Sequence, residues 1–182
     1  YGFVPADFAR SYTVPLPKSN IINKSMSVDD FRGISISPMI SKRFESCVLD
    51  RYREFFITSD SQFGFKKGLG CSHAIYSVRC VVSHYIRSGS TVNLCALDLK
   101  KAFDKTNHHG LYIQLMKRLI PRNLLCLLES WYSICITCVR WGDVFSNFVH
   151  LTCGVRQGGV LSPHLFACYI NDIVRIMEVS GL

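Results

Sequence analysis

The run Asn93-Leu-Cys-Ala-Leu-Asp-Leu-Lys-Lys-Ala-Phe-Asp104 constrains the fold of this chain more than any other segment. Residues 91–99 are rich in strand-forming side chains, and apolar residues fall on both faces of the extended backbone, which predicts a buried strand. Asp98 lies within it, where an ionised carboxylate needs a cation, a hydrogen-bond network or a chemical role to offset its desolvation. The segment therefore predicts either a metal-binding aspartate or a hydrogen-bonded structural one, and spacing alone does not choose between them.

Apolar periodicity predicts several helices and a hairpin around this strand. Helices are expected near residues 38–56, 74–86 with Gly89 ending the helix, 109–119, 122–133, and from Ser162-Pro163 onward. The segments 136–141 and 144–152 flank Gly142-Asp143 and predict a hairpin. Residues 1–34 are rich in turn residues, so only short β-like pieces such as 12–14 are expected there. The fold class that follows is α+β.

Composition narrows the class of protein. The chain has 182 residues, 48% of them hydrophobic, and a formal net charge of +8, which favours either a polyanionic partner or ordinary solubilising charge. No apolar run reaches the roughly 18 residues of a membrane span, and no signal peptide is apparent, so we expect an intracellular protein. The nine cysteines are expected to be reduced core thiols, and Cys135-x-x-Cys138 is a weak zinc signal.

A second unusual run, Gly154-Val-Arg-Gln-Gly-Gly-Val-Leu-Ser-Pro163, is typical of a glycine-rich loop that opens a helix. Its glycines would allow the backbone to approach a ligand closely, and Gln157 offers both a hydrogen-bond donor and an acceptor. Arg156 adds a charge that could contact phosphate. The alternative is a plain turn, because glycine marks turns readily.

Carboxylates and basic residues suggest nucleotide chemistry. Asp98 and Asp104 are six residues apart, and nucleotidyl transfer uses closely spaced carboxylates to hold two divalent cations. Asp98 suits a ligand, whereas Asp104 is expected to cap the following segment or to pair with a lysine. Phe103 is either a ring beside the substrate or plain core. Basic residues that could contact phosphate or a template strand, unless they simply belong to solvated surfaces, are Lys18, Arg32, Lys42, Arg43, and Lys66 and Lys67 beside Phe63 and Phe65.

Six segments in order resemble the reverse transcriptase of non-LTR (LINE-type) retrotransposons, over residues 12–178. They are Val14-Pro-Leu-Pro-Lys18, Phe31-Arg-Gly-Ile-Ser35, Ser41-Lys-Arg-Phe-Glu45, Gln62-Phe-Gly-Phe65, Leu97-Asp-Leu-Lys-Lys-Ala-Phe-Asp104 and the run 154–163. A group II intron-type relative is an alternative, although the Val-Arg-Gln-Gly-Gly sequence is more LINE-like. The resemblance implies a right-hand polymerase with a fingers-like segment at 1–90 and a partial palm at 91–182, in which helices pack on an antiparallel palm sheet.

The resemblance also implies a site. In such an RNA-directed DNA polymerase, two Mg²⁺ or Mn²⁺ ions promote attack of a DNA 3′-hydroxyl on a dNTP, with an RNA template and a DNA primer as partners. By the resemblance, Asp98 is catalytic and binds metal, the Leu99 carbonyl also touches metal, and Phe103 screens ribose from deoxyribose. The expected substrate-binding residues are Arg32, Lys42, Phe103, Gln157 and Gly158. Asp104 matches the motif without being a metal ligand.

Two departures from the family pattern matter. The usual Arg-Pro-Ile-Ser is Arg32-Gly-Ile-Ser35 here, and the aromatic-Ala-Asp-Asp hairpin and the thumb are expected only after residue 182. We therefore expect a truncated polymerase that is inactive in isolation, with an apolar surface exposed near Asp98. The alternative is a non-catalytic nucleic-acid-binding relic. A nuclear or cytoplasmic ribonucleoprotein location is expected, and the sequence indicates no particular oligomeric state.

Overall fold

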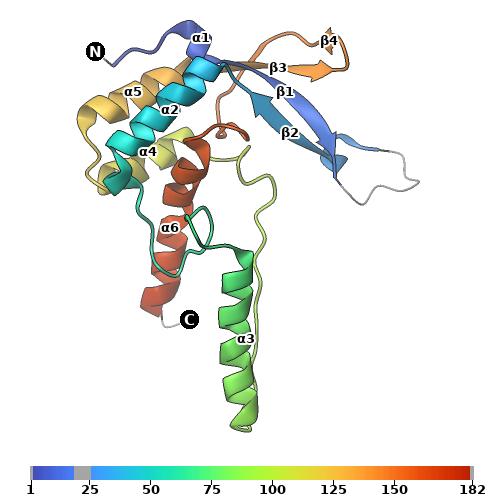
Figure 1. The fold of residues 1–182 in the computed structure, drawn as a ribbon, viewed down its shortest axis with the longest axis vertical. Coiled ribbons are helices and arrows are strands. Elements are labelled where there is room, and N and C mark those ends of the chain that lie inside the picture. The colour runs from blue at the N-terminus through green and yellow to red at the C-terminus, as the bar shows by residue number, and fades with distance from the viewer. Residues whose placement is uncertain (1, 19–25, 181–182) are drawn as a thin grey trace.

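Helices form the body of the molecule, a sheet extends from one side of it, and one long helix projects from another (Figure 1). The computed structural model describes residues 2–18 and 26–180, except for the side chains of residues 174–180. The helices are α1 (Ala6–Ala9), α2 (Met39–Arg51), α3 (Cys71–Arg87), α4 (His108–Lys117), α5 (Arg122–Ser133) and α6 (Ser162–Ser180), with 3₁₀ turns η1 (Val28–Asp30) and η2 (Arg53–Phe56). The strands are β1 (Arg10–Pro17), β2 (Phe31–Ile36), β3 (Ile136–Trp141), β4 (Val144–Phe145) and β5 (Val149–His150). The α+β class is confirmed.

The main core lies between α2, η2, α4, α5 and α6. Its centre is a set of fully buried leucines, Leu111, Leu115, Leu124, Leu128 and Leu165. Pairs four residues apart in α4 and α5 present one apolar stripe per helix, and burial of each leucine contributes about 1.5–3 kcal/mol. A smaller cluster of Val4, Ala9, Trp131 and Cys135 packs the N-terminal segment onto α5. None of the described helices is both long enough and apolar enough to cross a membrane.

The sheet has the strand order β2-β1-β3-β4, with β5 also paired to β3. β1 runs antiparallel to β2, with Tyr12 opposite Ile36, but parallel to β3, with Tyr12 opposite Cys138. The sheet is thus mixed: the strands within residues 91–182 pair antiparallel, β3 with β4 and with β5, and the parallel pair joins β3 to β1 from the first 90 residues. The reason is that helices and loops separate β1 from β3, and such a long connection permits parallel pairing, whereas β2 returns from β1 as a hairpin partner.

β1 is longer than the short pieces expected before residue 34. The prolines there argued against a strand because proline cannot donate a hydrogen bond to a ladder. The structure avoids this conflict because the pairing of β1 with β3 ends at Thr13, before Pro15 and Pro17. Those two residues pair with β2 alone, so one side of β1 is an edge where no donor is required.

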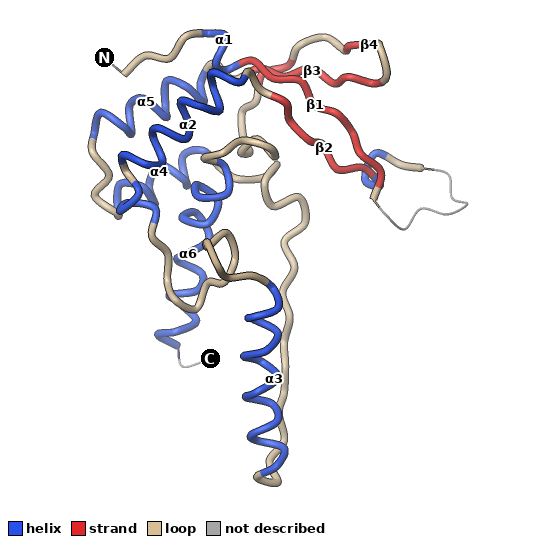
Figure 2. The backbone as a smooth tube through the Cα atoms, in the orientation of Figure 1, coloured by secondary structure: helices blue, strands red, loops and turns tan. Residues whose placement is uncertain are grey.

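The predicted buried strand at residues 91–99 is not present. These residues form an extended loop that runs back along α3 (Figure 2), and no described strand pairs with them. Most of their apolar side chains are exposed, with Leu97 at 81% and Leu94 at 66%. Strand-forming composition alone cannot make a strand, because each strand needs a neighbour to satisfy its backbone N–H and C=O groups. The prediction of burial on both faces is therefore wrong.

The helix predicted over 74–86 is confirmed as α3, and Gly89 takes a left-handed conformation with φ of +73° just beyond its end. No residue of α3 is buried, and the large apolar residues Ile75, Tyr76, Val78, Val81, Tyr85 and Ile86 are exposed. Exposed apolar side chains therefore lie on α3 and on the adjoining loop that contains Asp98. The other predicted helices and the 136–152 hairpin agree with α2, α4, α5, α6 and β3–β5 to within a few residues.

Candidate functional site

Asp98 lies in the extended loop and is exposed, so the desolvation argument that drew attention to it does not apply in this structure. Leu99, whose carbonyl is a predicted metal contact, is also in the loop and exposed. Among residues 2–18 and 26–173, no group of three or more His, Cys, Asp or Glu side chains is placed to hold a metal ion. One carboxylate and one carbonyl do not fit a two-ion site, because such a site needs several charged oxygen ligands.

The two unusual sequence runs meet through their backbones. Val155 N–H donates to the Phe103 carbonyl at 2.8 Å, and Gly154 N–H donates to the Thr106 carbonyl at 2.7 Å. Gly154 has φ of +88°, and a Cβ there would lie 2.8 Å from the Asp104 carbonyl oxygen, so only glycine fits this contact. The segment after Asp98 and the segment before Gln157 are thereby held together, although they are some fifty residues apart in sequence.

The Gln157–Gly158 loop lies on the free edge of β2. Ser35 N–H donates to the Gln157 carbonyl at 2.7 Å. Gly158 has φ of +125°, and a Cβ there would lie 2.4 Å from the Ser35 carbonyl oxygen. The close approach that glycine permits is therefore to this chain's own strand. The loop is placed next to the strand that carries Arg32, whose side chain is exposed.

Arg156 is buried, and its charge faces the interior. Its Nη2 lies 3.7 Å from Glu45 Oε1, with exposed fractions of 8% for Arg156 and 3% for Glu45. Arg156 Nη1 also donates to the Phe8 carbonyl at 3.2 Å, and the guanidinium lies 5.6 Å from the centre of the Trp131 ring. The idea that Arg156 contacts phosphate is therefore wrong, since its hydrogen-bonding groups face the core.

Glu45 is a residue that the sequence did not single out. Its Oε2 accepts a hydrogen bond from Leu161 N–H at 2.8 Å, so one carboxylate anchors both ends of the 156–161 loop to α2. A signal for it was available, because Ser41, Glu45 and Val48 share the buried face of α2 at helical spacing. A glutamate on a buried helix face requires a partner, and the loop supplies it.

Phe103 packs in a cluster of three aromatic rings. Its ring stacks on Phe166 with a centroid distance of 4.9 Å and an interplanar angle of 21°, and Phe65 meets it edge-on at 5.7 Å. Phe65 also meets Phe166 edge-on at 6.2 Å. The cluster brings the Gln62–Phe65 segment against the Asp98 segment and α6. Phe103 is half-buried, so one part of its ring is left accessible.

The remaining basic residues have separate positions. Lys101, after Asp98, pairs with Asp29 at 2.6 Å, and Lys18 Nζ donates to the Asp29 carbonyl, also at 2.6 Å. This ion pair lowers the pKa of Asp29 and raises that of Lys101. Lys42 is half-buried and, together with Val160, lines a shallow hollow of about 530 Å³ beside the glycine loop. The structure thus brings Lys42 near the 156–160 loop and links the Asp98 loop to the β1–β2 hairpin, but gives no contact between Arg32 and Asp98.

Two tyrosines of the helical body, Tyr112 in α4 and Tyr132 in α5, predict a loss of stability at alkaline pH. Burial, with a smaller contribution from Glu129, raises the pKa of Tyr112 to about 12, and burial also raises the pKa of Tyr132. Both phenols are protonated in the folded chain, while unfolded tyrosines ionise near pH 10. Their contribution to the free energy of unfolding is therefore complete below about pH 10. It is lost as the pH rises towards 12, because only the unfolded state releases these protons in that range.

Urea unfolding of the wild-type chain and of a Tyr112→Phe/Tyr132→Phe variant between pH 9 and 12 measures this effect. The difference in free energy of unfolding between the two proteins is expected to change with pH, while the lysines common to both cancel. A difference that stays constant across this range would contradict the assignment.

The chain thus has a mixed sheet beside a helical core, and its two motif runs are joined at the Phe103–Val155 contact. The family described as "Reverse transcriptase (RNA-dependent DNA polymerase)" matches residues 16–180, and the chain belongs to this family. The resemblance to reverse transcriptases is thereby confirmed, and its LINE-type part is borne out by the relatives below.

Several proteins with sequences similar to this chain come from mobile elements. The chain is 31% identical, over 79% of its length, to a probable RNA-directed DNA polymerase from transposon X-element of Drosophila melanogaster. It is 27% identical, over 86% of its length, to the RNA-directed DNA polymerase from mobile element jockey of Drosophila funebris. It is 26% identical, over 97% of its length, to the Pol polyprotein of the type-2 retrotransposable element R2DM of Drosophila melanogaster. The matched part covers only 16%, 18% and 16% of these relatives, respectively.

Proposed function

We propose that this chain is the fingers and upper palm of an RNA-directed DNA polymerase from a LINE-type retrotransposon. The observation that carries the proposal is the backbone contact between the Asp98–Asp104 and Gly154–Pro163 runs, both inside the matched region 16–180. In this proposal residues 1–90 are the fingers-like segment and residues 91–182 the partial palm. The complete enzyme transfers a nucleotide from a dNTP to a DNA 3′-hydroxyl on an RNA template, within a nuclear or cytoplasmic ribonucleoprotein.

We assign roles within the proposed site on the basis of the family motifs. Asp98 and the Leu99 carbonyl would supply part of a site for Mg²⁺ or Mn²⁺, which activates the attacking hydroxyl when bound. Gln157 and Gly158 lie under the incoming nucleotide and the template, and Phe103 packs against the sugar. Arg32 and Lys42 contact the triphosphate. Two observations support the assignment of these substrate-binding residues to one site. The Ser35–Gln157 hydrogen bond holds the 154–163 loop beside the strand that carries Arg32, and Lys42 lies near Val160 of that loop.

The test uses the longer protein that contains this chain. Magnesium-dependent extension of a labelled DNA primer on an RNA template is expected to fall to background in Asp98→Asn. Asp104→Asn is the matched control. It removes the same charge, and Asp104 lies six residues after Asp98 and is not a proposed metal ligand. Equal activity of Asp98→Asn and the wild-type protein would overturn the assignment.

The 182-residue chain by itself is expected to give no primer extension, because a two-metal reaction requires more carboxylates than Asp98 supplies. The purified chain is assayed with Mg²⁺ and with Mn²⁺, and the wild-type chain is compared with Asp98→Ala. Extension by the isolated chain that disappears in Asp98→Ala would contradict this expectation.

A second candidate function is a non-catalytic nucleic-acid-binding relic. The net charge of +8 favours it, together with the exposed position of Asp98 outside any cluster of metal-binding side chains in the described part of the chain. The two candidates differ in the Asp98→Asn experiment: a relic binds nucleic acid equally well with either residue and extends no primer with either.

A further inference from the structure

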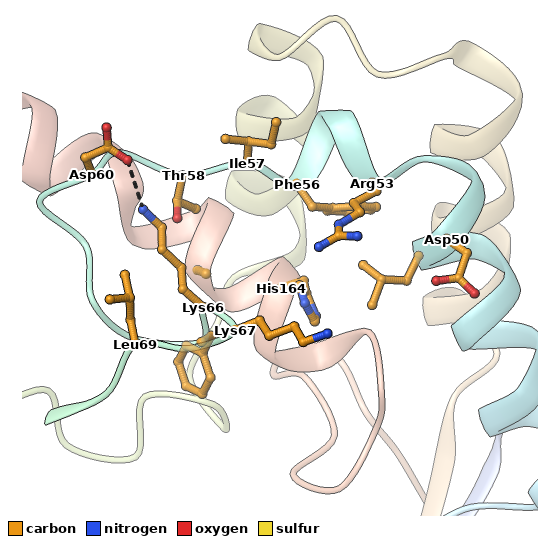
Figure 3. Close-up of a pocket in the computed structure, with 13 residues that line it drawn as sticks. Asp50, Arg53, Phe56, Ile57, Thr58, Asp60, Lys66, Lys67, Leu69 and His164 are labelled. Carbon is orange, nitrogen blue, oxygen red and sulfur yellow. Dashed lines mark ion pairs between the residues drawn. The ribbon is translucent and has the colours of Figure 1, made fainter.

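An open cavity of about 600 Å³ lies between the end of α2, the 57–69 loop and the first turns of α6 (Figure 3). Its polar lining includes Arg53, Lys66, Lys67 and His164, and its apolar lining includes Phe65 and Leu69. It is separate from the Asp98 loop and from the glycine loop, whose residues do not line it. The cavity connects to the candidate site through Phe65, whose ring meets Phe103 edge-on at 5.7 Å.

The cations of this cavity are not equivalent. Lys66 Nζ is already engaged, since it donates to the Ser59 carbonyl at 2.5 Å and lies 3.6 Å from Asp60. By contrast, neither the Arg53 nor the Lys67 side chain has a hydrogen bond or an ion pair with any described residue. In Figure 3 the Arg53 guanidinium and the Lys67 ammonium point into the same part of the cavity, with His164 between them. The two lysines are neighbours in sequence, and the structure gives them different surroundings.

His164 adds a hydrogen-bonding group to these two charges. Burial, together with the positive charge of Arg53, lowers the pKa of its imidazole, against a hydrogen bond to the Val160 backbone that raises it. The lowered pKa favours the neutral imidazole, which does not repel the neighbouring cations. The carboxylates that line the cavity are Asp60, which pairs with Lys66, and Asp50, which lies beyond Arg53 in Figure 3. The part between Arg53 and Lys67 is thus a site for an anionic group.

The apolar lining indicates what accompanies the anion. Phe65 is 47% exposed and lines the cavity, so part of its ring is open to a ligand. Proteins bind single-stranded nucleic acids by placing aromatic rings beside basic side chains. The bases stack on the rings, and the phosphates contact the cations. In a duplex the bases are stacked on each other and present no face to such a ring.

We propose that the cavity formed by Arg53, Phe65, Lys67 and His164 binds a phosphate and its adjoining base in a single strand of nucleic acid. The proposal rests on the proposed polymerase function in so far as that function requires a template strand. The bound strand would pass next to Phe65, and the edge-on contact of Phe65 with Phe103 places the strand one aromatic ring away from the Asp98 segment.

The experiment measures binding of a fluorescent single-stranded RNA 12-mer, and of the same sequence as a duplex, to the full 182-residue chain over a series of salt concentrations. An Arg53→Ala/Lys67→Ala variant is expected to bind the single strand at least about tenfold more weakly at 0.1 M salt. The slope of log K against log salt is expected to become shallower by about 1.4, at about 0.7 for each phosphate that the variant no longer neutralises. Arg122→Ala, which removes an exposed charge from the first turn of α5, is the control, and thermal melting verifies that each variant is folded.

The outcomes distinguish failure of the cavity assignment alone from failure of the proposed function as well. If the wild-type chain binds no single strand at all, both this proposal and the nucleic-acid part of the proposed function are overturned. If it binds, but the double variant matches Arg122→Ala in affinity and salt slope, only the cavity assignment fails. Competition by polyglutamate that equals competition by unlabelled RNA, and that is lost in the double variant, would show a site for acidic peptide and overturn the proposal.

Phe65→Leu should weaken binding of the single strand while leaving the salt slope unchanged, because it removes a stacking surface and no charge.

Discussion

Glu45→Ala is expected to lower the free energy of unfolding of the chain by about 3–5 kcal/mol. Removal of the carboxylate leaves the Arg156 guanidinium buried beside Trp131 without its counter-charge, and leaves the Leu161 N–H without an acceptor. The loss is large because the unpaired charge stays in the interior, where its desolvation is no longer offset. An exposed ion pair such as Arg10–Asp7 contributes at most about 1 kcal/mol by comparison.

Urea unfolding monitored by circular dichroism measures this effect. Glu54→Ala is the control, since Glu54 is an exposed glutamate at the nearby η2 turn and its loss is expected to change the free energy of unfolding by less than about 0.5 kcal/mol. Glu45→Gln should be milder than Glu45→Ala, because its amide oxygen can still accept from Leu161 N–H. If Glu45→Ala and Glu54→Ala were equally stable, the buried ion pair would not anchor the loop.

Gly158→Ala is expected to destabilise the chain by about 2–4 kcal/mol and to detach the glycine loop from β2. The backbone at Gly158, with φ of +125°, is a conformation that residues with a Cβ rarely adopt, and the new methyl group would lie 2.4 Å from the Ser35 carbonyl oxygen. Relief of this clash requires the loop to move away from the strand, which breaks the hydrogen bond from Ser35 N–H to the Gln157 carbonyl.

Two measurements distinguish loop detachment from general loss of stability. Amide hydrogen exchange at Ser35 should become faster in Gly158→Ala, while exchange at Leu115 in the core of α4 should change only with the global stability. Gly64→Ala is the matched control, because a Cβ at Gly64 has no atom within 4 Å and its φ is not positive. Unchanged protection of Ser35 in Gly158→Ala would contradict the strand-edge position of the loop. In the polymerase that we propose contains this chain, the same substitution should also reduce primer extension.

The helices were the most predictable part of this fold. Their apolar residues recur every three or four positions, and this local pattern shows which face of α4 or α5 is buried, whatever covers that face. Glycine and proline marked several ends correctly, for example Gly89 after α3 and Pro163 at the start of α6. The meeting of the Asp98 and Gly154 runs was expected only through the family resemblance, because nothing local in either run identifies the other.

The failures share one physical cause. Residues 91–99 have the composition of a strand, but a strand exists only when another segment pairs with its backbone, and the sequence of the run does not contain that information. The same holds for the cysteines: all nine are free thiols, yet six are exposed, including Cys71 and Cys80 on the uncovered α3. Apolar neighbours in sequence predicted burial there, while the arrangement of elements leaves that helix face open.

By itself, the sequence determined the family, the helices and hairpin, and the two runs that carry the candidate chemistry, because each depends on residue order or local periodicity. Only the tertiary structure decided which charges are available: Arg156 is bound to Glu45 in the interior, Lys66 is paired with Asp60, and Arg53 and Lys67 face an open cavity. A charged side chain has the same sequence signature in all these settings. Its partner is chosen by atoms from distant segments, and those atoms become neighbours only when the chain folds.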